Sequence, residues 1–440
     1  MNNLSFRTLL VCLPVVLLAS CSTPKVIIEK KPPAPASTVP VSENGVYNVR
    51  AFGAVGDGKT KDTVAFQRAL DACAAAGGGT VVVSNGLYVI GSIGIGTNTT
   101  LRFEGKASLM GSPDIEDYPL IQVRWEGEFR QGHRALIYAE NTAHVSIVGK
   151  GFIYGPPISV SHLRDPRGPA LIEVSVCDDV TLDGFTTLYQ QLWSIHPVLC
   201  KNLVARNLTI RTVNANGDGI DIDSCSGVLI EKCNIDTGDD AISLKSGRGL
   251  SAAQLARPTE NVTIRDCTLA SSIYAALGVG TELSGGIRNV RLENCTISGR
   301  QNAIYLKSRD GRGGYLENLT GENLIVQNSP TFIGIDFIKK GIQASDPVPG
   351  DVEKWTAMRN VTFNNISVHN VTDLVLGTAI PPQRPVENLT LTNIKGDCAH
   401  GIRLANMTNV VLSGIDVTGY SGDLITKSNV TGTGLDAARQ

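Results

Sequence analysis

The sequence predicts an all-β protein, a single-stranded parallel β-helix with one short helix at its N-terminal end. From residue 145 onward one phrase recurs: a turn carrying Asn, Asp or Gly, then a run in which apolar and polar residues alternate. Alternation with a period of two indicates strands, and Asn and Gly mark turns that need left-handed backbone geometry. Successive apolar anchors lie 21 to 42 residues apart. Such irregular steps above a shortest repeat are typical of a solenoid, in which extra residues enter loops.

The recurring runs occupy residues 179–182, 202–205, 227–230, 261–264, 289–292, 318–320, 360–363, 388–391 and 409–412. In a parallel β-helix each strand pairs with its counterpart one coil later, about 4.8 Å away, so equivalent side chains form ladders. A β-propeller also repeats strands, but it needs four antiparallel strands per repeat, and the hairpin loops between them are not evident here. The solenoid is therefore favoured, with residues 46–440 as its domain.

One convincing helix precedes the repeats, over residues 63–76, with Asp62 as its N-cap and the glycines at 77–79 ending it. A helix in this place would cover the unpaired strand edges at the open end of the coil. Its apolar stripe consists of Val64, Phe66, Ala69, Leu70 and Cys73.

The N-terminal segment has the features of a targeting signal. Arg7 precedes an apolar run over residues 9–18, which is shorter than the ~20 residues that a transmembrane helix needs. The segment Leu-Ala-Ser-Cys at residues 18–21 resembles a bacterial lipobox, which implies that residues 1–20 are a signal peptide and that Cys21 is lipidated. An ordinary cleaved secretory signal with an incidental Cys is the alternative.

Residues 21–45 form a Pro- and Ala-rich tether, too poor in bulky apolar residues to pack. We therefore expect an exported lipoprotein that meets a membrane only through its lipid. Ser22 after Cys21 resembles the sorting signal for the outer membrane, with the domain on its periplasmic or surface side. A formal net charge of -2 provides no long-range attraction for nucleic acid or an acidic membrane. A monomer is expected.

Of the 10 Cys, Cys12 and Cys21 belong to the signal, and the remaining eight lie in a domain where disulfides are chemically allowed. Their placement favours stacking as small buried side chains. A disulfide such as Cys225 with Cys233 stays open as an alternative. Five of the eight stand beside the ends of similar apolar strands: Cys177, Cys200, Cys225, Cys267 and Cys295.

Four further segments align with one another by their own pattern: residues 218–224, 240–246, 275–281 and 302–308. Their third and fifth positions are aliphatic, so these should face the core, and the fourth and sixth should face solvent. This register places Asp218 against Asp240 in the next coil, with Asp239 beside Asp240. Three carboxylates this close repel one another unless one of them holds a proton.

A protonated carboxyl beside ionised ones is what hydrolysis of a glycosidic bond requires, namely an acid for the leaving oxygen and a base for water. A lone Asp in a turn more often caps backbone groups. Capping does not require two adjacent carboxylates that face a third. The pattern therefore predicts a catalytic cluster of Asp218, Asp239 and Asp240.

Motifs at residues 52–58, 77–83, 192–197, 216–221, 238–247 and 281–290 resemble those of the polygalacturonase family, the family-28 glycoside hydrolases. The resemblance covers roughly residues 46–420 and implies a right-handed, pectin-lyase-like β-helix that inverts configuration while hydrolysing pectic oligo- or polysaccharide. By position, Asp239 is then the general acid, and Asp218 and Asp240 activate the water. No metal or cofactor is implied. Acid and base of inverting enzymes stand roughly 6.5 to 9.5 Å apart, which favours neighbouring coils.

The sequence departs from that family at two cationic positions. Tyr274 lies nearest to the place of a usual His, and Tyr305 replaces the Arg of an Arg-Ile-Lys motif, so only Lys307 remains. A phenol removes charge and adds a flat stacking surface. We expect Tyr274, Tyr305 and Lys307 to bind substrate, with one subsite for a neutral or differently substituted sugar, as in rhamnogalacturonan. The alternative is that Arg309 or Arg312 supplies the charge.

Further residues have less specific signals. Lys245 aligns over Asp223, which predicts a cross-coil ion pair. Trp193 and His196 precede the cluster by one coil, where a sugar platform and simple packing are both open.

Two other functions remain as alternatives. A polysaccharide lyase on the same fold is disfavoured by the lack of Arg at position 305, and a non-catalytic carbohydrate-binding surface β-helix would need the trio only for capping.

Overall fold

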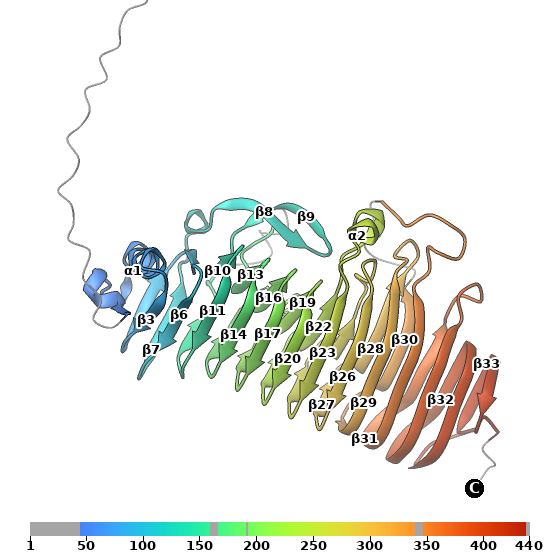
Figure 1. The fold of residues 1–440 in the computed structure, drawn as a ribbon. Helices are drawn as coiled ribbons and strands as arrows, with labels where there is room; N and C mark the ends of the chain where they lie inside the picture. Colours follow the sequence, from blue (N-terminus) through green and yellow to red (C-terminus); the bar gives the residue numbers. More distant parts are fainter. Residues whose placement is uncertain (1–44, 159–165, 191, 339–345, 437–440) are drawn as a thin grey trace, which may run out of the picture. The chain divides into compact units, whose positions relative to one another are not determined.

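The computed structural model describes residues 45–158, 166–190, 192–338 and 346–436. These residues fold as a right-handed single-stranded parallel β-helix, which confirms the predicted fold class (Figure 1). The predicted signal peptide, Cys21 and the tether up to residue 44 lie outside the described residues. Within the described segments, no helix is long and apolar enough to cross a bilayer.

Each coil contributes three strands, and through most of the chain a strand pairs in parallel with the strand three places later. Sheet 1 contains β5 (Ile93–Gly94), β10 (Ile137–Glu140), β13 (Ile172–Ser175), β16 (Ile195–Val198), β19 (Ile220–Asp223), β22 (Ile242–Lys245), β25 (Ala275–Val279), β28 (Asn302–Arg309) and β30 (Thr331–Ile338). Sheet 2 contains β1 (Val46–Asn48), β3 (Gly79–Val83), β6 (Thr99–Phe103), β11 (Ala143–Val148), β14 (Asp178–Asp183), β17 (Lys201–Arg206), β20 (Ser226–Glu231), β23 (Thr259–Arg265) and β26 (Ile287–Glu293).

Sheet 3 contains β2 (Asp57–Lys61), β4 (Gly86–Ile90), β7 (Ala107–Gly111), β12 (Phe152–Tyr154), β15 (Thr186–Leu188), β18 (Thr209–Arg211), β21 (Asn234–Thr237), β24 (Thr268–Ser271) and β27 (Thr296–Gly299). The final strands are long and pass from one sheet into another: β29 (Tyr315–Gln327), β31 (Ala357–Ala379), β32 (Val386–Thr418) and β33 (Ile425–Thr433). Two short 3-10 segments are η1 (Val49–Phe52) and η2 (Ile115–Asp117).

The predicted N-terminal helix is present as α1 (Thr63–Ala75), which packs beside the first strands of the stack (Figure 1). The predicted stripe is wrong at Val64, which is 62% exposed, and Ala65 is buried in its place. Asp62 stands at the N-cap position, but its carboxylate accepts hydrogen bonds from the backbone N–H groups of Val55 and Gly56, at 2.7 and 3.0 Å. It therefore fixes the preceding loop and not the helix end.

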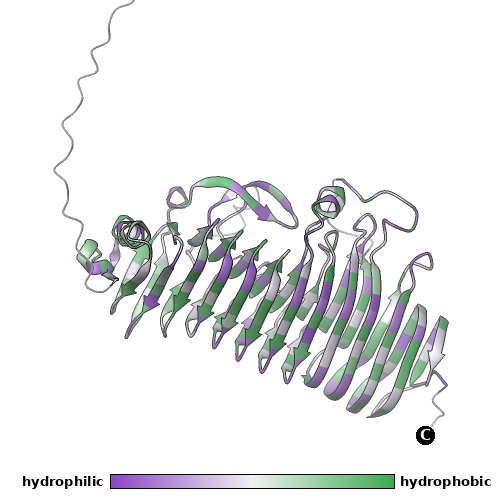
Figure 2. Ribbon diagram, in the orientation of Figure 1, coloured by the Kyte–Doolittle hydropathy of each residue, from purple (hydrophilic) through white to green (hydrophobic). Residues whose placement is uncertain are grey.

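Apolar and polar residues alternate along the strands, as Figure 2 shows. A column of Asn side chains in left-handed backbone conformation marks the turns of sheet 2. In this Asn ladder each Nδ2 donates to the Oδ1 of the Asn one coil earlier, at 2.7 to 3.2 Å. The ladder consists of Asn261, Asn289, Asn318, Asn360, Asn388 and Asn409.

The predicted register of sheet 1 is confirmed. Ile220 pairs with Ile242, Ile242 with Leu277, and Leu277 with Ile304. These four side chains are fully buried, as are the aliphatic side chains two residues after each of them. The core thus consists of aliphatic ladders that run through successive coils.

The expectation that the outward positions of this sheet face solvent is wrong for the two coils that carry the acidic trio. Two insertions cover them on the same side of the stack (Figure 1). One is the antiparallel hairpin of β8 (Leu120–Trp125) and β9 (Glu128–His133), and the other contains α2 (Gly249–Leu255). The covered outward side chains are Asp221, Asp223, Ser243 and Lys245.

All eight cysteines of the described residues are buried and free. The backbone N–H of Cys200 donates to Sγ of Cys225 at 3.3 Å, and that of Cys233 donates to Sγ of Cys267 at 3.4 Å. Both contacts join neighbouring coils, which confirms stacking. The alternative of a disulfide between Cys225 and Cys233 is wrong for this structure.

Candidate active site

The three carboxyls predicted to act together meet just before β19 and β22. The backbone N–H of Gly219 donates to the carbonyl of Asp240 at 3.0 Å, so Asp218 lies one coil from Asp240, as predicted. One carboxyl oxygen from each of Asp218, Asp239 and Asp240 lies within 4.8 Å of the other two. Stacking of consecutive coils therefore brings Asp218 to the adjacent pair Asp239 and Asp240, which lie 21 and 22 positions later in the chain.

The oxygens are closer together than the roughly 6.5 to 9.5 Å expected between the carboxyls of an inverting pair. The reason is the coil spacing of about 4.8 Å, which sets the separation of groups on adjacent strands. We expected carboxyls on neighbouring coils to have the acid-to-base spacing of inverting enzymes. The nearest carboxyl oxygens of the trio are closer together than that, so this expectation is not met.

A cavity of about 440 Å³ lies over the trio. All six residues predicted to catalyse or to bind substrate line it: Asp218, Asp239, Asp240, Tyr274, Tyr305 and Lys307. Other charged or amide side chains complete the wall, and they are Glu126, Asn216, Lys245, Arg248, Glu282, Gln301, Arg309 and Arg312. Both signs of charge therefore face one enclosed space.

Asp239 is the most accessible carboxyl of the trio, since the other two are buried. Its Oδ2 accepts a hydrogen bond from the backbone N–H of Asn216, and its Oδ1 accepts one from the N–H of Asp240, both at 2.8 Å. Two backbone donors thus fix the direction of this side chain at the cavity wall.

Asp240 is held by a cation. Its Oδ2 accepts from Nζ of Lys307 at 2.8 Å, and its Oδ1 accepts from the backbone N–H of Ala275 at 3.2 Å. Lys307 was predicted to bind substrate, and it does line the cavity. Its first partner, however, is a member of the trio, so it also pairs directly with Asp240.

Burial and neighbouring charges raise the pKa values of Asp218 and Asp239. Burial, together with the carboxyls of Asp221 and Asp239, raises the pKa of Asp218 well above its usual value. Burial and the charge on Asp240 raise the pKa of Asp239. Asp218 and Asp239 therefore hold their protons to a higher pH than an exposed Asp does.

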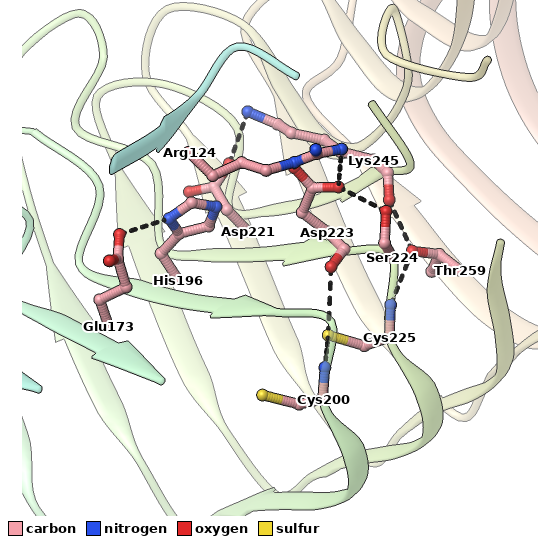
Figure 3. A network of polar contacts seen from close by, with 10 residues as sticks. All are labelled: Arg124, Glu173, His196, Cys200, Asp221, Asp223, Ser224, Cys225, Lys245 and Thr259. Carbon is pink, nitrogen blue, oxygen red and sulfur yellow. Dashed lines mark hydrogen bonds and ion pairs between the residues drawn. The ribbon is translucent and has the colours of Figure 1, made fainter. Parts of the chain in front are cut away.

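A buried ionic network supports the trio from the neighbouring positions of sheet 1 (Figure 3). Nζ of Lys245 lies 2.7 Å from Oδ1 of Asp221, and Nε of Arg124 donates to Oδ2 of Asp223 at 2.8 Å. Burial acts to raise the pKa of Asp223, but Arg124 outweighs it and lowers that pKa. The predicted ion pair of Lys245 with Asp223 is wrong, because Arg124 from the hairpin takes Asp223.

Trp193 and His196 both contact this network. Nζ of Lys245 lies 3.6 Å from the centre of the Trp193 ring, and the guanidinium of Arg167 lies 4.0 Å from it. The fully buried His196 places Nδ1 3.1 Å from Oε2 of Glu173 (Figure 3). His196 is fully buried and is not among the residues that line the cavity, which favours packing for it. Trp193 is only 3% exposed but lines the cavity, so packing and a sugar platform both stay open for it.

The two tyrosines at the family's cationic positions differ in their contacts. The hydroxyl of Tyr305 donates to Oδ2 of Asp336 at 3.1 Å, whereas the backbone carbonyl of Tyr274 accepts from the N–H of Gln301 at 2.9 Å. Arg309 and Arg312 also line the cavity, so the alternative that they supply the missing charge agrees with the geometry. Burial lowers the pKa of Arg312 to about 10.

Within the described residues, the trio is the one group of three or more acidic, His or Cys side chains whose ligand atoms converge. Two ammonium groups already lie at these carboxyls, Lys307 at 2.8 Å from Asp240 and Lys245 at 3.9 Å from Asp218. A divalent cation among the same oxygens would meet their repulsion. The donor set therefore does not favour a metal.

Sequence reasoning missed several charged residues of the wall. Glu126 belongs to the turn of the β8–β9 hairpin, where no repeat pattern exists to assign a position. Arg248 pairs with Glu128 at 2.5 Å, and Glu282 belongs to a motif already noticed at residues 281–290. The one feature of the sequence that could have identified such residues is their position next to a motif, since Arg248 directly follows the segment 238–247.

An acidic trio in which the pKa values of Asp218 and Asp239 are raised, set in a cavity on the outside of a parallel β-helix, defines a glycoside hydrolase that acts on O-glycosyl bonds of a polysaccharide. The chain belongs to the glycosyl hydrolases family 28, whose family model matches residues 73–434.

Named relatives agree with this membership. A probable polygalacturonase of Vitis vinifera is 32% identical over 61% of this chain and 58% of its own length. An exo-poly-alpha-D-galacturonosidase of Dickeya chrysanthemi is 26% identical over 85% of this chain and 75% of its own length. The crystal structure of a hyperthermoactive exopolygalacturonase from Thermotoga maritima superposes with a TM-score of 0.72 at 26% identity, covering 85% of this chain and 93% of that one.

Proposed function

We propose that this protein hydrolyses galacturonate-containing bonds of pectic polysaccharide, with Asp239 as the general acid and with Asp218 and Asp240 as the pair that activates water. The observation that carries the proposal is the convergence of the three carboxyls within 4.8 Å in a cavity that also presents cations. The names of the Vitis vinifera and Dickeya chrysanthemi relatives support galacturonan as the polymer.

Asp239 suits the acid because it is the accessible member of the trio and its pKa is raised by burial and by Asp240. Its proton passes to the glycosidic oxygen while the bond from that oxygen to the anomeric carbon breaks. Water attacks the anomeric carbon and gives its proton to Asp218 or Asp240. The raised pKa of Asp218 places its ionisation at a higher pH than that of an exposed Asp, so activity rises as this carboxyl loses its proton.

The substrate follows from the cavity's aromatic and cationic residues. Tyr305 takes the place of an Arg, which removes a forked positive charge from one subsite. We propose a neutral or differently substituted sugar there, as in a rhamnogalacturonan-type chain. The competing proposal assigns the galacturonate carboxylate to Arg309 or Arg312, which line the same cavity.

Product analysis on polygalacturonate and on rhamnogalacturonan fragments tests both proposals. Faster cleavage of plain polygalacturonate would remove the neutral-sugar subsite in favour of the arginines. Saturated products without new ultraviolet absorbance are expected, whereas an unsaturated product would assign a lyase. Proton NMR of the first product reports its anomeric configuration. Retention of configuration would overturn the inverting mechanism. The test is a demanding one because the carboxyl oxygens of the trio are closer together than is usual for an inverting pair.

A further inference from the structure

Three aromatic rings form a row on the outside of sheet 3, away from the cavity. Phe152 and Tyr154 project from β12, with ring centroids 6.3 Å apart and planes inclined by 23°. Tyr189, directly after β15 in the next coil, continues the row at 6.4 Å and 20° from Tyr154. Phe152 is 39% exposed and Tyr189 is 64% exposed. The three rings, here called the aromatic platform, thus stand nearly parallel to one another in a row, and two of the three are exposed to solvent.

The platform is in line with the acidic trio along the axis of the coil. The N–H of Tyr189 donates to the carbonyl of Arg211, and the N–H of Thr212 donates to that of Asp236, both at 3.1 Å. Tyr189 therefore corresponds to Thr237 two coils later, and Asp239 follows Thr237 by two residues. At about 4.8 Å per coil, Tyr189 and the acid stand about 10 Å apart along the axis.

An exposed apolar residue lies in the coil between Tyr189 and Asp239. Val213, in the coil between, is 69% exposed. It lies against the turn that carries the acid, because a Cβ built on Gly238 would stand 2.5 Å from the carbonyl carbon of Val213. One exposed apolar side chain therefore stands in the coil between Tyr189 and the turn that carries Asp239.

The rings are local to these coils and do not belong to a repeated core pattern. In the row of Phe152, the next outward positions are Thr186, Thr209 and Asn234. In the row of Tyr154, Leu188 follows in the next coil, and the polar residues Arg211 and Asp236 follow in the two coils after it. Exposed aromatic clusters of this kind mark ligand-binding surfaces, and flat rings without a charge of their own suit the apolar C–H face of a sugar.

We propose that Phe152, Tyr154 and Tyr189 bind pyranose units of the same polysaccharide chain, two to three coils away from the bond that is cleaved. The platform holds the polymer by stacking, while the charged cavity selects the sugars at the reacting bond. The choice of polymer rests on the proposed function, but the stacking surface itself is independent of catalysis.

The test measures KM for a long galacturonan or rhamnogalacturonan polymer and for the shortest oligosaccharide that the protein cleaves. Tyr189→Ala and Phe152→Ala should each raise KM for the polymer, by about tenfold together, and change KM for the short substrate by less than about twofold. Tyr189→Phe keeps the ring and should retain polymer binding. Equal effects on both substrates would place these rings inside the cleavage site and overturn the proposal, as would no effect on the polymer.

Ile325→Ala is the matched control. Ile325 is 44% exposed and occupies the same outward row as Phe152, beyond the trio, where it pairs with Thr296. Its substitution should leave both KM values unchanged, and thermal melting checks that every variant folds.

Direct polymer binding separates this proposal from the proposed function. If no substrate of the panel is cleaved but Asp239→Asn protein binds polymer and loses that binding with Tyr189→Ala, the platform stands and the hydrolase assignment fails. If cleavage is found and polymer binding is the same with and without the rings, the platform fails and the hydrolase assignment stands.

Discussion

The ammonium group of Lys245 contacts Asp221 at 2.7 Å, although the backbone register places Lys245 opposite Asp223. The diagonal contact arises because Arg124 of the inserted hairpin already occupies Asp223. Burial acts to lower the pKa of Lys245, but Asp221 outweighs it and raises that pKa. Lys245 therefore remains charged beside Asp218 and balances part of the acidic cluster.

Replacing Lys245 with Met should destabilise the fold by about 3 to 5 kcal/mol, because Asp221 is left as an unpaired buried charge. Denaturant unfolding monitored by circular dichroism measures this loss. Lys427→Met is the control: its pair with Asp436 is exposed, so the loss should be about 1 kcal/mol or less. Equal losses would mean that burial does not distinguish the two pairs.

Asp239→Asn should lower kcat by about 10² to 10⁴, because the amide cannot donate an acid proton to the leaving oxygen. Thermal melting should show an intact fold. Asp236→Asn, an exposed Asp three residues earlier on the same coil, should keep normal activity. Full activity in the Asp239 variant would exclude it as the acid and support capping as the role of the trio.

Asp218→Asn should remove activity and yet stabilise the protein at neutral pH. The folded pKa of Asp218 is raised, so below the unfolded value near ~3.9 both states hold the proton and the carboxyl costs nothing. Between the unfolded pKa and the raised folded pKa, the unfolded chain ionises while the native carboxyl keeps its proton, so the native state loses stability as the pH rises through this range. The free energy of unfolding of the variant relative to the wild type should therefore grow from pH 3 to pH 7. A constant difference over that range would contradict the raised pKa.

The eight buried thiols should be silent towards a thiol reagent such as DTNB in the native protein and react fully after denaturation. Because no disulfide joins these cysteines, a reductant should leave the melting temperature unchanged. A melting temperature that falls on reduction would reveal a covalent link between the stacks.

Lipidation of Cys21 remains a prediction from its lipobox-like segment. Cells that express the full chain should incorporate radioactive palmitate into it, and Cys21→Ser should abolish the label. Fractionation then tests the proposed outer-membrane location. Release of an unlabelled wild-type protein after cleavage would favour the ordinary secretory signal.

The repeated part of the fold was predictable because its information is periodic. Each coil restates the same alternation, so the pairing of Ile220 with Ile242 could be derived by aligning the sequence with itself. The same register brought Asp218 to Asp240 and placed Tyr305 and Lys307 at the cavity. Since the coil spacing is fixed, a correct alignment is sufficient to locate residues on neighbouring strands.

The parts that could not be predicted lie in the insertions. The β8–β9 hairpin and α2 have no counterpart in other coils, so nothing in the sequence indicated that they would cover the outward face of sheet 1. Arg124 therefore displaced the expected partner of Lys245, and Asp221 became buried. Which of several neighbouring acids a Lys or Arg pairs with depends on such covering segments, and an alignment of the repeats does not contain them.

The Asn ladder has a consequence for the folding of the chain. Its amide hydrogen bonds form only when Asn residues of successive coils meet, and a slip by one residue would also turn every apolar side chain of that coil outward. A mispaired coil therefore loses its amide contact and its core contact together. Each added coil is therefore held in register by the coil before it. Because the register does not depend on the loops, loops of very different length can connect the strands without changing the strand order.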